Sequence, residues 1–143
     1  MKSAFSLLEL IVVILIVSIL ASFIISKSET SIDFSIKTKV KSDIALIRSS
    51  ISKLKTNKIL LNDEFINSLD SASINSNKSM LFSKVLDFPL ISTTEENKKI
   101  GNWIKSSATE YMVYLNTTKA LKFNFENNYF VCKSDLDLCI DYE

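Results

Sequence analysis

The spacing of apolar residues divides the first 60 positions into two segments. Residues 5–26 read FSLLELIVVILIVSILASFIIS, a nearly unbroken apolar run whose only charge is Glu9. A helix rises about 1.5 Å per residue, so this run covers about 33 Å, against about 30 Å for the hydrocarbon core of a bilayer. We therefore expect residues 5–26 to form a transmembrane helix.

A second, amphipathic pattern follows the apolar run. From Ile32 onward apolar residues recur in steps of three and four, which is the stripe of a helix with one buried face. They are Ile32, Ile36, Val40, Ile44, Ile47, Ile51 and Leu54. Because residues 1–60 contain no Pro or Gly, we expect residues 27–60 to extend the same helix. The result would be one rod of about 50 residues, roughly 75 Å long.

The remaining residues, 61–143, predict a small globular domain that begins with short helices. One is expected over 63–72, behind an N-terminal cap at Asn62, because its apolar residues have helical spacing. A second is expected over 79–86, ending before Pro89.

The C-terminal third predicts an antiparallel sheet. Three stretches are rich in aromatic and aliphatic strand formers: 111–115, 121–125 and 129–132. Asn127 and Asn128 can close a tight hairpin, since Asn tolerates a left-handed backbone conformation. One face of this meander should pack on the helix stripe, with Trp103 in the join. The expected fold class is α+β: a long N-terminal helix packed on a small antiparallel sheet.

The position of Glu9 within the apolar run carries a free-energy cost. A carboxylate one turn into a membrane segment costs on the order of 3 kcal/mol or more unless it is paired. The short basic head before it, residues 1–4, should stay in the cytoplasm by the positive-inside rule. An ordinary signal peptide is disfavoured, because residues 23–25 continue the apolar run beyond a poor cleavage site at Ala21 and Ser22, and because Glu9 stands where a signal peptide should be apolar.

The stretch KSAFSLLELIVVILIVSIL resembles the N-terminus of type IV pilins and of the pseudopilins of type II secretion and DNA-uptake machines. The resemblance implies that residues 1–4 are a leader, which a prepilin peptidase removes between Ala4 and Phe5. It further implies that Phe5 is then N-methylated and that Glu9 is required for assembly. Two features depart from the family: Ala4 stands where Gly is usual, and Ser18 and Ser26 stand where a helix-breaking Gly and Pro are often found.

A physical role for Glu9 agrees with this resemblance. Cleavage would create an ammonium at Phe5, which can pair with Glu9 of an adjoining copy. Such an ion pair in a low dielectric is far costlier to leave half made than to complete, so it would select one axial offset between copies. The alternative is that Glu9 reaches out to the cytoplasmic headgroups.

The two cysteines, Cys132 and Cys139, predict a disulfide. A domain exported to an oxidising compartment can join them, closing a loop of about eight residues; free thiols are the alternative. Many type IV pilins close a C-terminal loop in this way. A zinc site is disfavoured because the chain has no histidine.

Charge is distributed unevenly. Residues 27–58 carry eight basic and three acidic side chains, whereas residues 126–143 carry five acidic and one basic. A nucleic-acid partner is not supported, since no aromatic residues interleave with the lysines to stack bases; we expect the basic face to meet the acidic tail of the same or a neighbouring copy. Asp135, Asp137 and Asp141 are candidate Ca²⁺ ligands, because some pseudopilins bind calcium in a C-terminal loop. A solvated acidic surface is the preferred interpretation, so no cofactor is expected.

The residue inventory points away from catalysis. With no His, one Gly and two Cys, the chain lacks a phosphate-binding loop or a nucleophile–base pair, so we expect a non-enzyme. The first function class is a pilin or pseudopilin, polymerised at the bacterial inner membrane with its C-terminal domain in the periplasm. Its partners would be the prepilin peptidase and methyltransferase, other subunits, the assembly platform and membrane lipid. The second is a non-polymerising single-pass protein that presents a periplasmic binding domain.

Overall fold

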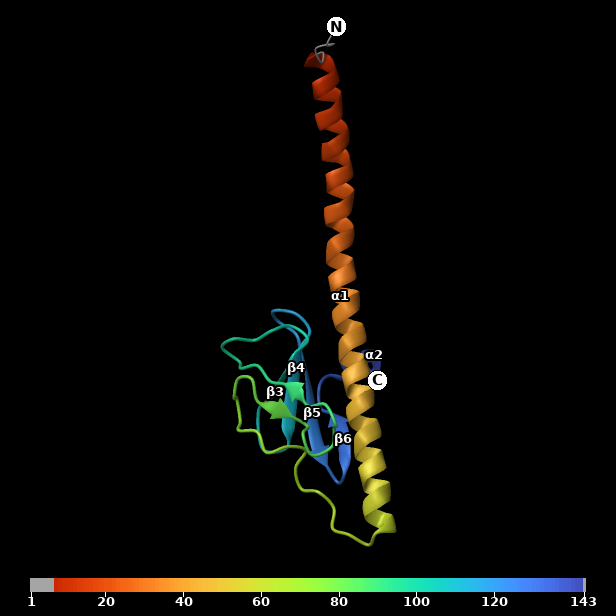
Figure 1. Ribbon diagram of the computed structural model, residues 1–143, viewed down its shortest axis with the longest axis vertical. Coiled ribbons are helices and arrows are strands. Elements are labelled where there is room, and N and C mark those ends of the chain that lie inside the picture. The colour runs from red at the N-terminus through yellow and green to blue at the C-terminus, as the bar shows by residue number, and fades with distance from the viewer. Residues whose placement is uncertain (1–6, 143) are drawn as a thin grey trace. The chain divides into compact units, whose positions relative to one another are not determined.

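The computed structural model describes the backbone of residues 7–142, and the side chains of these residues except 23–33. The chain divides into two units, Met1–Ser35 and Ile36–Glu143, and each is described by itself. Helix α1 (Leu7–Leu60) supplies residues 7–35 to the first unit and 36–60 to the second (Figure 1). The second unit also holds both sheets and a short C-terminal helix. The fold class is α+β, as the sequence predicts.

Helix α1 ends in a left-handed cap rather than leading into another helix. Asn62 has φ 53°, and its N–H donates to the carbonyl of Ile59 (3.2 Å) while the N–H of Asp63 donates to the carbonyl of Lys58 (2.9 Å). These two bonds form a Schellman motif, in which Asn replaces the usual Gly. The predicted N-terminal cap at Asn62 is therefore wrong, because the same residue closes the preceding helix.

The larger sheet is a four-stranded antiparallel meander. In the order β3-β4-β5-β6 its strands are β3 (Trp103–Lys105), β4 (Glu110–Tyr114), β5 (Ala120–Glu126) and β6 (Tyr129–Cys132). Asn127 and Asn128, at φ 52° and 62°, close the β5–β6 hairpin as predicted. A two-stranded sheet pairs β1 (Met80–Leu81) with β2 (Leu90–Ile91). The three predicted strands are confirmed, whereas β1, β2 and β3 were not expected.

The core lies between residues 36–60 of α1 and one face of the four-stranded sheet (Figure 1). The helix buries Val40, Ile44, Ile47 and Ile51, four members of the predicted stripe. The sheet contributes alternate residues of β5, namely Leu121, Phe123 and Phe125. Trp103 fills the join as expected: it is buried, and its Nε1 donates to Asp43 Oδ2 at 3.0 Å. The apolar face of the helix, which repeats every 3.6 residues, thus packs against the apolar face of the sheet, which repeats every two residues.

Both outer strands of the meander have hydrogen bonds on their free edges. On β6, the Phe130 carbonyl accepts from Arg48 Nε at 3.0 Å. On β3, the carbonyl of Trp103 accepts from the N–H of Thr93 (3.0 Å) and that of Lys105 from the N–H of Asn75 (2.9 Å). The Arg48 side chain and the backbone N–H groups of Thr93 and Asn75 therefore occupy carbonyls that an edge strand otherwise presents to solvent.

The two short helices predicted between 63 and 86 are wrong. Residues 63–73 have no helix, and residues 79–86 contain β1 followed by a turn with Phe82 at φ 59°. Phe82 is held there because its ring packs on Tyr111 (4.6 Å between centroids) and its N–H donates to the buried Asp70 (3.0 Å). These tertiary contacts override a helical pattern that was only two turns long.

A helix that was not predicted ends the chain: α2 (Leu136–Tyr142). Its first backbone bond runs from the N–H of Cys139 to the carbonyl of Asp135 at 2.9 Å, which places Asp135 at the N-cap. Asp is a preferred cap residue. Both the cap residue and the spacing of Cys139 and Tyr142, about one helical turn apart, could have been recognised in the sequence. In the structure these two side chains are the buried residues of α2.

Candidate functional site

Residues 7–22 form a helical segment with exposed apolar side chains on every side. Twelve large hydrophobic residues between Leu7 and Leu20 are 47–76% exposed. The hydroxyl of Ser18 is turned inward, because it donates to the carbonyl of Ile14 at 2.7 Å. Exposed apolar surfaces of this extent are typical of sites that contact other molecules.

Glu9 lies in the first turn of α1 and is exposed. Ala4 and Phe5, the predicted cleavage and methylation sites, lie outside the described residues. The predicted membrane segment, 5–26, extends beyond the described side chains at both ends. Within the part of the chain that the structure describes, none of the helices combines the length and the apolarity needed to cross a membrane.

The C-terminal helix α2 is anchored at two points. Cys132 of β6 and Cys139 of α2 are joined by a disulfide with 5.9 Å between their Cα atoms. Asp141 Oδ2 accepts from Lys37 Nζ of α1 at 2.9 Å, and that ammonium lies 5.5 Å from the centre of the Tyr142 ring. The Lys37 hydrogen bond and charge lower the pKa of Asp141. This pair is one case of the predicted meeting between the basic helix and the acidic tail.

The three aspartates considered as calcium ligands line a wide hollow and are not grouped around one possible ion position. Asp135, Asp137 and Asp141 line a hollow of about 710 Å³ with Thr118 and Lys119. Among the described residues, no group of three or more His, Cys, Asp or Glu side chains is placed to hold a metal ion.

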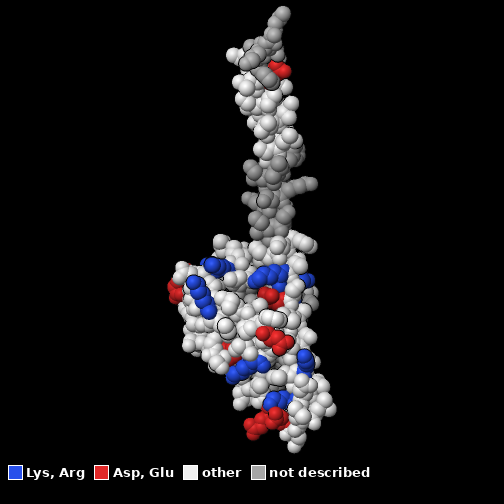
Figure 2. Space-filling view, viewed as in Figure 1, with Lys and Arg blue, Asp and Glu red and all other residues white. Residues whose placement is uncertain are grey.

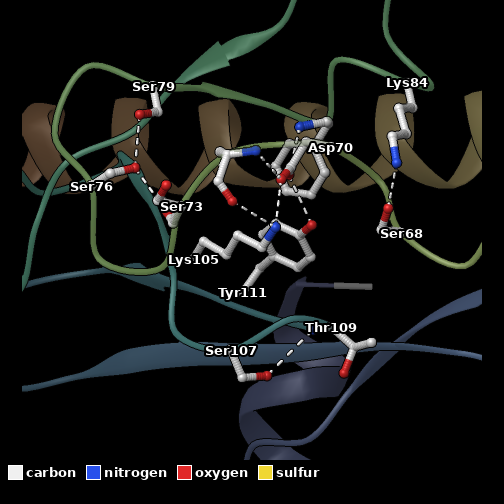
Figure 3. A network of polar contacts seen from close by, with 12 residues as sticks. Ser68, Asp70, Ser73, Ser76, Ser79, Lys84, Lys105, Ser107, Thr109 and Tyr111 are labelled. Carbon is white, nitrogen blue, oxygen red and sulfur yellow. Dashed lines mark hydrogen bonds and ion pairs between the residues drawn. The ribbon is translucent and has the colours of Figure 1, made fainter.

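A buried polar network, centred on Asp70, was not anticipated (Figure 3). The Asp70 carboxylate accepts from Lys105 Nζ (2.7 Å) and from the hydroxyl of Tyr111 (2.8 Å). It also accepts from the N–H groups of Phe82 (3.0 Å) and Ala72 (3.1 Å). The side chains of Lys105 and Asp70 are only 7% and 0% exposed, so both charges are withdrawn from water.

This network is structural in character. Asp70 satisfies four donors at once, and Lys105 donates in addition to the carbonyl of Ala72 at 3.0 Å. Burial, and then the hydrogen bond to Asp70, raise the pKa of Tyr111, so its hydroxyl stays a donor. All four donors, including the Lys105 ammonium, are thus occupied in holding the Asp70 carboxylate in place. The network attaches the loop around residues 70–82 to β3 and β4.

Charges of both signs are interspersed on the face of the second unit that Figure 2 shows. Figure 2 shows Lys and Arg side chains next to Asp and Glu side chains on its visible face. Ion pairs contribute to this mixture: Lys58 with Asp63 at 2.8 Å, and Lys133 with Glu126 at 2.6 Å.

Comparisons of the chain with protein-family models, with curated proteins and with solved structures find no match. A functional assignment therefore depends on the residues and contacts described above.

Proposed function

We propose that this chain is a pilin or pseudopilin: a structural subunit that is polymerised from the bacterial inner membrane into a type IV pilus-like fibre, serving type II secretion or DNA uptake. The observation that carries the proposal is the helical segment of residues 7–22, apolar on all sides, with Glu9 as its one charged residue.

The apolar segment suits two environments in succession. Before assembly it lies in lipid, with residues 1–4 in the cytoplasm and the chain from residue 27 onward in the periplasm. After assembly it is buried among the same segments of other copies. The Cys132–Cys139 disulfide supports delivery of the domain to an oxidising compartment.

Glu9 directs the transfer from lipid to fibre. In the proposal, prepilin peptidase removes residues 1–4, Phe5 is N-methylated, and its ammonium pairs with Glu9 of the next copy. A half-made pair leaves one charge in an apolar surrounding, at a cost on the order of 3 kcal/mol or more. The assembly platform and the neighbouring subunits are thus the main partners, and no catalytic role is assigned. A non-polymerising membrane protein would need the same apolar helix but has no use for Glu9.

The mass of the N-terminus tests the proposal directly. Protein from the native host should lack residues 1–4 and carry one additional methyl group. The variant Glu9→Ala should insert into membranes normally and fail to enter fibres, whereas Glu64→Ala, which removes an exposed carboxylate of the globular domain, should assemble like the wild type. Retention of residues 1–4, or fibres that contain normal amounts of Glu9→Ala, would contradict the proposal.

A further inference from the structure

A hollow with an apolar floor and a basic rim lies between α1 and β6, and we call it the α1–β6 hollow. It measures about 570 Å³, and the residues that matter for the argument are Arg48, Ile51, Lys55, Ile59, Tyr129 and Phe130. Ile51 and Phe130 are buried in its floor, while Ile59 and Tyr129 remain exposed at its opening.

The rim of the α1–β6 hollow is positive. Lys55 Nζ contacts the hydroxyl of Tyr129 at 2.9 Å and lies 4.0 Å from the centre of its ring. An ammonium has three donors, so this contact leaves Lys55 able to bind a carboxylate as well. The Lys55 hydrogen bond also lowers the pKa of Tyr129, as expected beside a positive charge.

Helix α2 carries the complementary surface. Leu136 and Ile140 are four residues apart, so they lie on one helix face, and they are 74% and 64% exposed. Asp137 and Asp141 form the adjacent acidic row. Asp141 is engaged by Lys37, whereas within the described chain no ion pair engages Asp137. An apolar ridge with a carboxylate beside it matches an apolar floor with an ammonium on its rim.

The two surfaces lie at different heights along α1, so one copy cannot bring them together. Helix α2 meets α1 at Lys37, while the α1–β6 hollow borders residues 48–59. The centres are separated by about 16 residues, or roughly 25 Å of helix. Contact between parallel copies thus joins two different surfaces at an axial offset. A contact of this type is heterologous and extends into an open chain.

We propose that the α1–β6 hollow binds helix α2 of a second copy, with Leu136 and Ile140 over the apolar floor and Asp137 at Lys55. The parallel arrangement rests on the proposed function, because copies that share a membrane point the same way. The contact is small and weak by itself, and repetition along a fibre gives it avidity. It joins globular domains, and it is separate from the pairing of Phe5 and Glu9.

Photo-crosslinking of the full chain in the membranes and fibres of its native host tests this contact. A photoreactive benzoylphenylalanine in place of Ile140 should form adducts between copies that map to residues 48–59 or 128–131. The same group in place of Phe88, an exposed residue that belongs to neither surface, should give no adducts at these positions. Adducts from position 140 that map elsewhere, or none at all, would overturn the inference.

Charge-reversal variants test the contact between Lys55 and Asp137 specifically. Lys55→Glu and Asp137→Lys should each lower the yield of the position-140 adduct about threefold, and the double variant should restore it. Lys53→Glu and Asp87→Lys, the same changes at exposed positions outside both surfaces, should leave the yield unchanged. Trp103 fluorescence verifies that every variant is folded. Failure of the double variant to recover would exclude the Lys55–Asp137 contact.

The experiments distinguish failure of this contact from failure of the proposed function. If residues 1–4 are removed and fibres require Glu9 but position 140 crosslinks elsewhere, the function stands and the docking site is wrong. If residues 1–4 are retained but the predicted adducts form, the docking site stands and the polymer proposal is wrong.

Discussion

Lys105→Met should destabilise the protein strongly although it keeps the length and the apolar stem of the side chain. The substitution removes the ammonium that lies 2.7 Å from Asp70 Oδ1 and leaves a fully buried carboxylate without its counter-charge. Removing one partner of a buried pair typically costs about 3–5 kcal/mol. The three remaining donors to Asp70, from Phe82, Ala72 and Tyr111, favour the lower end of that range.

The chain offers a matched control for this substitution. Lys133→Met breaks an ion pair of similar length, 2.6 Å to Glu126, but its partners are 45% and 39% exposed. Exposed pairs contribute about 0–1 kcal/mol, so the two Lys→Met variants should differ by at least about 2 kcal/mol. Adding Asp70→Asn to Lys105→Met removes the unpaired charge and should recover about 1 kcal/mol or more.

Urea unfolding of the full chain in detergent measures these effects. Trp103 is the only tryptophan and is buried in the core, so its fluorescence reports on unfolding of the second unit. The unfolding midpoint should move while the slope stays constant. If Lys105→Met falls within about 1 kcal/mol of Lys133→Met, burial does not distinguish the two pairs and the reasoning is refuted.

Three further predictions use the same assay. Cys139→Ser should cost about 2.5 kcal/mol through loss of the eight-residue loop, and wild type treated with a reductant should match it; an unchanged midpoint would argue against the disulfide. Asn62→Ala should cost about 1 kcal/mol because Asn62 is left-handed, whereas Asn57→Ala, inside α1, should be neutral or stabilising; equal effects would exclude the cap. Because the folded state raises the pKa of Tyr111, only the unfolded state ionises it near pH 10, so the free energy of unfolding should fall as the pH rises above about 10. Tyr111→Phe should reduce this slope, and an unchanged slope would count against the assignment.

Local periodicity was enough to predict the parts of the fold that repeat. The stripe through Val40, Ile44, Ile47 and Ile51 is buried because the positions three and four apart share a helix face. The hairpin at Asn127 and Asn128 follows from the left-handed tolerance of Asn. Glu9 could be singled out from sequence alone, since a lone charge in an apolar run is conspicuous without coordinates.

Contacts between residues that are far apart in the sequence explain the features that were not predicted. Asp70 and Lys105 are 35 residues apart, and neither belongs to a pattern that predicts a buried pair. Their network places Phe82 in a left-handed turn where sequence spacing favoured a helix. The α1–β6 hollow likewise combines residues of α1 with residues of β6, about 80 positions later in the chain. No window of consecutive residues contains such a site.

The hydrogen bonds on the free edges of β3 and β6 bear on how safely this protein can be concentrated. When copies are concentrated, an edge strand with unpaired backbone groups can pair with an edge strand of another copy, and such pairing can lead to amyloid. Here Arg48, Thr93 and Asn75 already engage acceptors that an incoming strand would use. Addition of a foreign strand at the outer side of β3 or β6 must therefore first displace these bonds, which makes that route to aggregation less favourable.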